Sequence, residues 1–388
     1  MPALMERSLP EPSEDAKAAS RALCARIAED IRRNGGWISF ARYQELALYE
    51  SGLGYYAGGS HKFGAEGDFV TAPELTPLFG QALARQVAQV TAASRPVVLE
   101  AGAGSGRLAA DLLLALDALG AAPERYLILE LSGELRARQR ATIEGEAPAL
   151  AGRVEWLDAM PERFSGCVVG NELLDAIPVL TFAQREAGVM ERGVELAEDG
   201  HFAWAERPAG APLAAAVAEL HLPTGFVGEA GLPARAWTAE WGPRLECGAL
   251  LLIDYGLPRH ELYHPQRSGG TVRCHYRHRA HDDPFWWPGL SDITTHVDFT
   301  AVAEAGHDAG LGVLGYTSQA TFLMNCGIGE LLAARQTAND ESSARALRAA
   351  QVLMAPGEMG ELFKVIALGR GIAGPLLGFA LGDRLHAL

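Results

Sequence analysis

The sequence predicts an α/β fold built on a mostly parallel sheet, with a helical region in front of it. From residue 97 onward, short apolar runs alternate with segments of helical periodicity, which is typical of parallel βαβ units. The first run leads through a glycine-rich turn at 102–106 into a helix at 107–119, a connection typical of Rossmann-like sheets. At 388 residues the chain is longer than one minimal domain, so we expect additions to this core.

The chain begins with a helical region, residues 1–95, that contains a long irregular connection. Apolar residues recur at helical spacing within 23–31, and Ser39 is a suitable N-cap for a second helix. Glycines crowd residues 52–67, and we expect a loop there that extends to Glu74.

The end of this loop is set by Thr76 and Pro77. Proline is tolerated at the first helical position but is costly inside a helix, so we predict Thr76 as the N-cap and Pro77 as the first residue. This choice leaves Asp68, Thr71 and Glu74 on the loop, and we expect Thr71, Pro73 and Glu74 to bind the cofactor.

Seven apolar runs are predicted to form the core sheet. Turn residues or helical segments separate each run from the next, as expected for strands joined by crossovers. The runs lie at 97–100, 126–130, 153–157, 166–170, 249–254, 312–318 and 361–368.

The alternation breaks between the fourth and fifth strands, where we predict an inserted α+β segment at 179–247. Glu198-Asp199-Gly200 is suited to a hairpin turn within it. The insertion divides the core into a first part at 96–178 and a second part at 248–388. Its strand-like runs lie at 179–184, 189–197 and 201–205.

Composition and charge exclude several classes of protein. Hydrophobic residues make up 48% and charged residues 21%, which is typical of a globular protein. The net charge of −15 would repel nucleic-acid phosphates, and the richest basic stretch, 259–279, is followed by Asp282 and Asp283, so we expect no nucleic-acid partner. The apolar tail segment at 371–381 is about half the ~20 residues that a membrane span requires, so we expect no membrane span.

The cysteines and the N-terminus indicate where the protein resides. The 5 cysteines lie far apart with no Cys-x-x-Cys pair, which favours neither a disulfide framework nor a zinc ribbon and fits a reducing compartment. The N-terminus lacks an apolar secretory core, and its acidic residues argue against a mitochondrial presequence. We therefore expect a cytoplasmic protein.

The glycine turn predicts a nucleoside cofactor. Glu100 ends the first strand, and Gly102, Ala103, Gly104 and Gly106 allow close approach of the backbone to a ligand. A dinucleotide fingerprint would require glycine at the position of Arg107, whereas acidic-x-G-x-G-x-G is the form that binds S-adenosylmethionine. The sequence therefore predicts S-adenosylmethionine as the cofactor.

Two further acids lie at the ends of the next two strands. A carboxylate at Glu130 can accept hydrogen bonds from both ribose hydroxyls of the cofactor. Asp158 follows the third strand, where a short acid can accept the adenine amino group, although a turn-forming role is equally consistent.

The fourth strand leads to candidate catalytic residues. Asn171 can offer its carbonyl to the cofactor ammonium or to a substrate N–H. Glu172 and Asp175, three residues apart, are expected on one face of a following helical turn, where they would suit an N–H-rich cation such as arginine guanidinium. The alternative is that both acids only complement the dipole of that helical turn.

Other acids and histidines are weaker candidates. Asp254 and Tyr255 end the fifth strand beside the same crevice, and either one could be functional. The pattern of Asp292, His296 and Asp298 suggests a metal site, but Asp298 is better placed as the N-cap of a helix, and we predict no metal. A cluster of three histidines is predicted to lie on a solvated loop, at 275, 278 and 281.

The order of these motifs resembles the MidA family of S-adenosylmethionine-dependent methyltransferases. The resemblance runs from about Ile31 to Leu368. It is carried by Gly-Asp-Phe-Val-Thr-Ala-Pro-Glu at 67–74, Leu-Glu-Ala-Gly-Ala-Gly-Ser-Gly at 99–106, Gly-Asn-Glu-Leu-Leu-Asp-Ala-Ile-Pro-Val at 170–179, Leu-Ile-Asp-Tyr-Gly at 252–256, Asp-Ile-Thr-Thr-His-Val-Asp-Phe at 292–299 and Met-Gly-Glu-Leu-Phe-Lys-Val at 359–365.

Membership of this family would imply a class I methyltransferase fold whose last two strands form an antiparallel hairpin. It would also imply that the glycine turn binds the cofactor, that Asn171 and Glu172 lie beside the methyl group, and that the loop from Asp68 to Glu74 covers the cofactor. The mitochondrial members dimethylate a protein arginine symmetrically and assist assembly of respiratory complex I. The resemblance therefore implies a protein arginine as substrate and a respiratory-complex subunit as a candidate partner.

Three functions follow from these observations. The first is a protein arginine methyltransferase. The second is an assembly factor that binds the cofactor without catalysis, since the catalytic acids are inferred from position. The third is a nicotinamide-dependent oxidoreductase, which Arg107 at the third glycine position disfavours.

Overall fold

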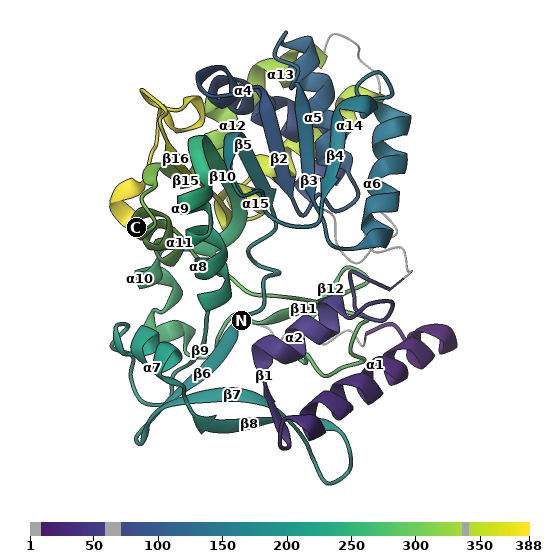
Figure 1. Cartoon of the computed structure of the whole chain (residues 1–388), viewed down its shortest axis with the longest axis vertical. Coiled ribbons are helices and arrows are strands. Elements are labelled where there is room, and N and C mark those ends of the chain that lie inside the picture. The colour runs from purple at the N-terminus through teal and green to yellow at the C-terminus, as the bar shows by residue number, and fades with distance from the viewer. Residues whose placement is uncertain (1–8, 59–70, 336–340) are drawn as a thin grey trace. The chain divides into compact units, whose positions relative to one another are not determined.

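The computed structural model describes residues 9–58, 71–335 and 341–388 (Figure 1). Two compact units are present, and each is assembled from segments that are separate in sequence. The first unit comprises Met1–Val70, Leu180–Ala230 and Gly269–Thr294, and the second comprises Thr71–Val179, Gly231–Ser268 and Thr295–Leu388. Within the described ranges, none of the helices is both long and apolar enough to cross a membrane.

The second unit is built on the predicted seven-stranded sheet. Its order is β15-β16-β10-β5-β2-β3-β4, in which β16 is antiparallel to both neighbours and the other neighbours pair in parallel. Every predicted core strand overlaps an observed one, so this prediction is confirmed. A short strand, β14 (Val297–Asp298), also pairs with β10. The seven are β2 (Val97–Ala101), β3 (Arg125–Leu129), β4 (Val154–Leu157), β5 (Phe164–Asn171), β10 (Leu245–Leu257), β15 (Gly312–Ser318) and β16 (Phe363–Arg370).

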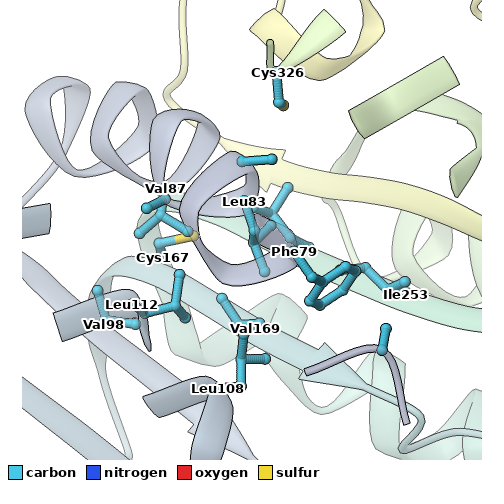
Figure 2. Packing of buried hydrophobic residues seen from close by; sticks show 14 of the residues in the cluster. Phe79, Leu83, Val87, Val98, Leu108, Leu112, Cys167, Val169, Ile253 and Cys326 are labelled. Carbon is cyan, nitrogen blue, oxygen red and sulfur yellow. The ribbon is translucent and has the colours of Figure 1, made fainter. Parts of the chain in front are cut away.

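Helices cover both faces of this sheet, and the central strands are therefore almost continuously apolar. On one face, α4 (Pro77–Ala93) and α5 (Arg107–Ala118) pack against the sheet. On the other face lie α8 (Leu232–Ala239) and α11 (Phe299–Asp308). Figure 2 shows the first of these cores, with side chains from α4, α5 and the sheet in one cluster that includes Phe79, Leu83, Val87, Val98, Leu108, Leu112, Cys167 and Val169.

The predicted helix caps are present in the second unit. The Thr76 side chain accepts a hydrogen bond from the Leu78 backbone N–H at 3.3 Å, and α4 begins at Pro77. Asp298 accepts a hydrogen bond from the Ala301 N–H at 2.9 Å and begins α11. Both predictions are confirmed, because each cap satisfies an N–H that the helix itself leaves unpaired.

The placement of Glu74 on a loop was wrong. Thr71 precedes a short helix, α3 (Ala72–Leu75), in which Pro73 lies in the first turn. Proline has no N–H to lose at that position, so the turn is compatible with it. Glu74 is therefore held on a helical turn directly before α4.

In its described residues, the first unit has three helices and two small sheets. Ser39 caps α2 as predicted, accepting a hydrogen bond from the Arg42 N–H at 3.1 Å. The predicted insertion strands pair as an antiparallel meander, to which the unpredicted strand β1 (Trp37–Ser39) adds. The unit contains α1 (Glu14–Arg33), α2 (Phe40–Tyr49), α7 (Ala211–Ala218), β6 (Leu180–Arg185), β7 (Gly188–Leu196), β8 (Phe202–Pro208), β9 (Val227–Ala230), β11 (Arg273–Tyr276), β12 (Arg279–His281) and β13 (Asp292–Thr294).

The observed units differ from the division that the sequence suggests. Residues 180–230 pair with the N-terminal region, whereas residues 231–247 belong with the core sheet because α8 packs on it. The second unit is completed by α6 (Gly133–Glu146), α9 (Trp241–Arg244), α10 (Arg259–Leu262), α12 (Gln319–Asn325), α13 (Ile328–Arg335), α14 (Glu341–Met354) and α15 (Met359–Leu362).

Candidate functional site

The candidate site lies at the carboxyl edge of the sheet in the second unit. Parallel pairing aligns Ala101 with Leu129 and Gly170, and Asn171 with Ile253. The carboxyl ends of β2, β3, β5 and β10 therefore meet at one edge, where open α/β sheets bind ligands. The predicted site residues in the described ranges lie at or just after the ends of β2, β3, β4 and β5, or on the segment from Thr71 to Glu74.

The glycine turn adopts a backbone that side chains would disfavour. Gly102, Gly104 and Gly106 have φ values of 70°, 51° and 84°, and Gly106 is the N-cap of α5. A Cβ on Gly106 would also lie 2.8 Å from the Cα of Gln139. The turn therefore needs glycine for both conformation and space, and it leaves the N-terminus of α5 open to a ligand.

Glu130 is fixed by a residue that sequence reasoning missed. Its carboxylate accepts hydrogen bonds from the Ser132 N–H at 2.9 Å and from Gln139 Nε2 at 3.1 Å. Burial raises the pKa of this carboxyl group, and these hydrogen bonds oppose the rise.

Gln139 connects three parts of the site. The same Nε2 lies 3.2 Å from the Gly104 carbonyl, and the Gln139 carbonyl accepts a hydrogen bond from Trp156 Nε1 at 2.9 Å. Gln139 is fully buried on α6, which has few other buried residues. A glutamine in a mostly polar helix gives no sequence signal, so only the folded geometry could identify it.

Asp158 lies at the rim and not inside the site. Its side chain is 91% exposed and forms an ion pair with Arg136 at 2.8 Å. Arg136 also donates to the carbonyls of Glu130 and Leu157, which ties together the ends of β3 and β4. Leu131, next to Glu130, is 80% exposed and provides an apolar surface at the same edge.

Glu74 reaches the glycine turn from α3. The Ser105 hydroxyl donates a hydrogen bond to the Glu74 carboxylate, and the Arg107 N–H donates to Ser105 Oγ at 3.3 Å. Thr71 and Pro73 lie on the same segment, and their contact with the cofactor stays a prediction. The preceding part of the predicted covering loop, which includes Asp68, lies outside the described residues.

Glu100 is in the interior beneath the turn. It is 2% exposed, and its Oε2 accepts a hydrogen bond from the Tyr126 hydroxyl at 2.5 Å. Burial raises the pKa of Glu100 to about 7. Its position supports the end of β2, and direct contact with the cofactor stays a prediction.

Asn171 and Glu172 form the start of the other half of the site. Asn171 Nδ2 donates to the Glu172 carboxylate at 3.1 Å, while Asn171 Oδ1 is buried and has no partner among the described residues. Glu172 has a φ of 51°, which is uncommon for a residue other than glycine, and its N–H donates to the Ile253 carbonyl at 2.9 Å. This strain is typical of functional positions.

The expected helical turn after Asn171 is absent, and that prediction was wrong. Residues 172–178 form an irregular turn: the Ile177 N–H donates to the Leu174 carbonyl at 3.3 Å, and two other backbone N–H groups bond to a side chain on β10. Asp254 Oδ2 accepts from the N–H groups of Leu174 and Asp175, at 2.8 and 3.2 Å. Glu172 and Asp175 therefore do not share a helix face.

Asp175 instead points into the interior beside β10. Its side chain is 4% exposed, and its carboxylate accepts a hydrogen bond from the Tyr255 hydroxyl. Burial raises the pKa of Asp175 to about 6 and, with the charges of Asp175 and Glu172, also raises the pKa of Asp254. The second Asp175 oxygen, Oδ1, is buried without a partner in the described part of the chain.

These residues fit a nucleoside cofactor that carries a cationic methionine group. The glycine turn provides a backbone cradle, Glu130 provides a fixed carboxylate, and Asn171 Oδ1 is an acceptor that lacks a donor. We call the ends of β2 and β3, with the glycine turn and Glu130, the cofactor half of the site, and the ends of β5 and β10 its acceptor half. The acceptor half provides the acids that a cationic methyl acceptor would require.

Comparison with known proteins agrees with this geometry. Residues 78–317 match the Methyltransf_28 family model, described as an S-adenosyl-L-methionine-dependent methyltransferase. The chain is 27% identical over 368 residues to the protein arginine methyltransferase NDUFAF7, mitochondrial, of Danio rerio, covering 86% of this chain and 83% of the relative. The Homo sapiens protein of that name is 28% identical over 371 residues, covering 87% and 81%.

Two crystal structures of Burkholderia thailandensis proteins are similar over nearly the whole chain. One, bound to S-adenosyl-homocysteine, is 54% identical with a TM-score of 0.95 and covers 98% of this chain and 100% of its own. The other, a native structure, is 53% identical with a TM-score of 0.93 and the same coverage. The class I methyltransferase fold predicted from the sequence is confirmed by this similarity and by the strand order.

Proposed function

This chain belongs to the Methyltransf_28 family of S-adenosyl-L-methionine-dependent methyltransferases, and from that premise we propose that its methyl acceptor is an arginine side chain of a protein. The predicted cofactor and the resemblance to the MidA family are confirmed by the same matches. The oxidoreductase alternative is excluded by family membership. The acceptor half of the site supports arginine as the methyl acceptor.

The observation that carries this proposal is the set of hydrogen-bond acceptors at the end of β5. Asn171 Oδ1 lacks a donor, and Glu172 is held in a strained conformation beside it. A buried acceptor without a donor is costly, so a ligand with several N–H groups would be stabilised there. Guanidinium has five N–H donors in one plane and a permanent positive charge, which complements an amide carbonyl and a carboxylate.

The chemistry needs little beyond orientation and a route for one proton. S-adenosylmethionine supplies a methyl group activated by a sulfonium centre. As the new N–C bond forms and the S–C bond breaks, the guanidinium nitrogen must lose one proton. In our proposal the Glu172 carboxylate holds that nitrogen in line and accepts this proton, and Asn171 orients the carboxylate. Curated relatives named as protein arginine methyltransferases, at 27% and 28% identity, support the same acceptor.

The test is the identity of the methylated residue. Extract from a strain that lacks this gene would be incubated with the purified protein and S-adenosylmethionine labelled at the methyl group, then hydrolysed to amino acids. We expect the label in symmetric dimethylarginine, carried by one or a few proteins on a gel. Label on another amino acid would contradict the proposal, and binding of S-adenosylhomocysteine without any transfer would favour an assembly factor without catalysis.

A further inference from the structure

Tyr255 is a polar residue at the carboxyl edge that the proposed reaction does not yet use. It lies near the end of β10, directly after Asp254, and β10 pairs with β5 so that Ile253 is aligned with Asn171. Tyr255 is half-buried, unlike Asp175, whose side chain is almost fully buried. Tyr255 therefore lies at the same carboxyl edge of the sheet as Asn171 and Glu172.

The Tyr255 hydroxyl is oriented by its partner. A hydroxyl can donate one hydrogen bond and accept two, but a carboxylate can only accept. Because the hydroxyl donates its proton to Asp175, its oxygen presents only lone pairs to any other group. The Tyr255 ring is fixed as well, since it packs edge-on against His296 at 5.4 Å and Phe363 at 5.5 Å between ring centroids.

We propose that Tyr255 contacts the acceptor nitrogen and that Asp175 is a positioning residue that acts through it. With its proton committed to Asp175, the Tyr255 oxygen accepts a hydrogen bond from a guanidinium N–H. It thereby adds a third acceptor to the Asn171 carbonyl and the Glu172 carboxylate. Because this role presumes an arginine acceptor, it rests on the proposed function.

This arrangement would select acceptors by the polarity of their hydrogen bonds. A methyl acceptor that presents N–H groups is stabilised by three fixed acceptor atoms. A methyl acceptor that presents a carbonyl or carboxylate oxygen offers no N–H donor to these atoms. Its binding is disfavoured, because the buried acceptors of the site would stay unpaired. The buried Asp175 carboxylate also places negative charge behind Tyr255, which favours a cation at the hydroxyl.

The charged and titratable groups around this pair come from three segments. Asp254 lies on β10, Glu172 lies on the turn after β5, and His296 lies between β13 and β14. Burial raises the pKa of Asp175 to about 6, so the side chain is ionised above that pH. Its negative charge is lost as the pH falls below that value. Loss of the charge removes the requirement that Tyr255 donate, and the acceptor site should weaken.

The test compares Tyr255→Phe and Asp175→Asn in the labelled-methyl assay on extract from the deletion strain. We expect initial rates that are about 10- to 100-fold lower in both variants, while the affinity for S-adenosylhomocysteine stays within about twofold. The wild-type rate should fall below about pH 6, and the variants should lose this dependence. Tyr316→Phe is the matched control, because its buried hydroxyl has no partner among the described residues, and it should keep the wild-type rate.

A spectroscopic measurement tests the hydrogen bond without any acceptor. With ¹³C at the tyrosine Cζ position, the Tyr255 resonance is the one missing in Tyr255→Phe. We expect it to titrate near pH 6 in the wild type and to stop titrating in Asp175→Asn. An unchanged resonance in Asp175→Asn would overturn the positioning role.

Two further results would overturn the proposal. One is a wild-type rate in Tyr255→Phe. The other is a tenfold loss of S-adenosylhomocysteine affinity in both variants, which would indicate a structural role. Failure of the proposed function is visible separately, because label on a residue other than arginine appears in the wild-type hydrolysate before any variant is compared. A wild type that transfers no label would contradict both.

Discussion

The two halves of the candidate site satisfy their polar groups in opposite ways. At the ends of β2 and β3, Glu130 and Gln139 have partners within the protein, and Glu100 is bonded to Tyr126. At the ends of β5 and β10, oxygens of Asn171 and Asp175 are buried without partners among the described residues. The first group belongs to the cofactor half and the second to the acceptor half.

This difference indicates which half of the site is rigid before a ligand binds. A carboxylate held by two internal donors keeps its geometry whether or not a ligand is present, which lowers the cost of binding a cofactor. An unpaired buried acceptor costs free energy until a donor arrives, so it favours the ligand that supplies one. The cofactor half is therefore prepared in advance, whereas the acceptor half is completed by its substrate.

The largest expected effect is on the glycine turn of the cofactor half. Gly106→Ala would place a Cβ 2.8 Å from the Gln139 Cα at a φ of 84°, so the turn must shift away from α6. We expect a loss of about 2–4 kcal/mol in the free energy of unfolding. Affinity for S-adenosylhomocysteine should fall by more than about 100-fold, measured by calorimetry.

A second glycine separates conformational strain from the close contact. Gly120 has a φ of 69°, but a Cβ there would meet nothing within 4 Å. Gly120→Ala should therefore cost only about 1 kcal/mol and leave cofactor affinity unchanged. Equal losses in the two variants would show that the contact with Gln139 is unimportant, and the preparation of the cofactor half would then be in doubt.

A smaller effect is expected from the residue that orients Glu130. Gln139→Leu keeps the volume but leaves Glu130 and Trp156 without their shared partner. We expect affinity for S-adenosylhomocysteine to fall about 10- to 50-fold, with the thermal transition as the check on folding.

Asp158→Ala is the comparison for this variant. Glu130 and Asp158 follow neighbouring strands, but the Asp158 side chain is 91% exposed and forms its ion pair at the rim. An exposed ion pair contributes little, so the variant should lose less than about threefold in affinity. If Asp158→Ala weakened binding as much as Gln139→Leu, internal pairing would not be what prepares the cofactor half.

The sequence could predict the cofactor half better than the acceptor half, for a physical reason. The glycine turn, Thr76 and the strands depend on local patterns, because caps and turns are specified by residues close together in sequence. Gln139 bonds to Glu130 and to Trp156, which are brought together only by the sheet. No local sequence pattern indicates such a long-range contact.

The turn after β5 shows where local reasoning fails. The spacing of Glu172 and Asp175 suits a helix, but Asp254, about eighty residues later, accepts the N–H groups of Leu174 and Asp175. These long-range hydrogen bonds replace the expected helical turn, and the Asp175 side chain lies in the interior. Similarly, strand β1 is too short to have a period-two pattern, and it forms because β7 pairs with it.

A last comparison separates stability from function in the acceptor half. Glu172 has a φ of 51°, so Glu172→Gly should relieve backbone strain and raise the free energy of unfolding by up to about 1 kcal/mol. The same change removes the carboxylate that we propose for the acceptor, so methyl transfer should fall while affinity for S-adenosylhomocysteine is kept. Chemical denaturation, calorimetry and the labelled-methyl assay would measure the three quantities on one preparation.

Glu172→Gln completes this comparison, because it keeps the side chain and the strain but loses the charge. It should reduce methyl transfer without the gain in stability. If Glu172→Gly instead destabilised the protein, the left-handed backbone would be supported by the Glu172 side chain and its bond with Asn171. The acceptor half would then be prepared in advance like the cofactor half, and the contrast between them would disappear.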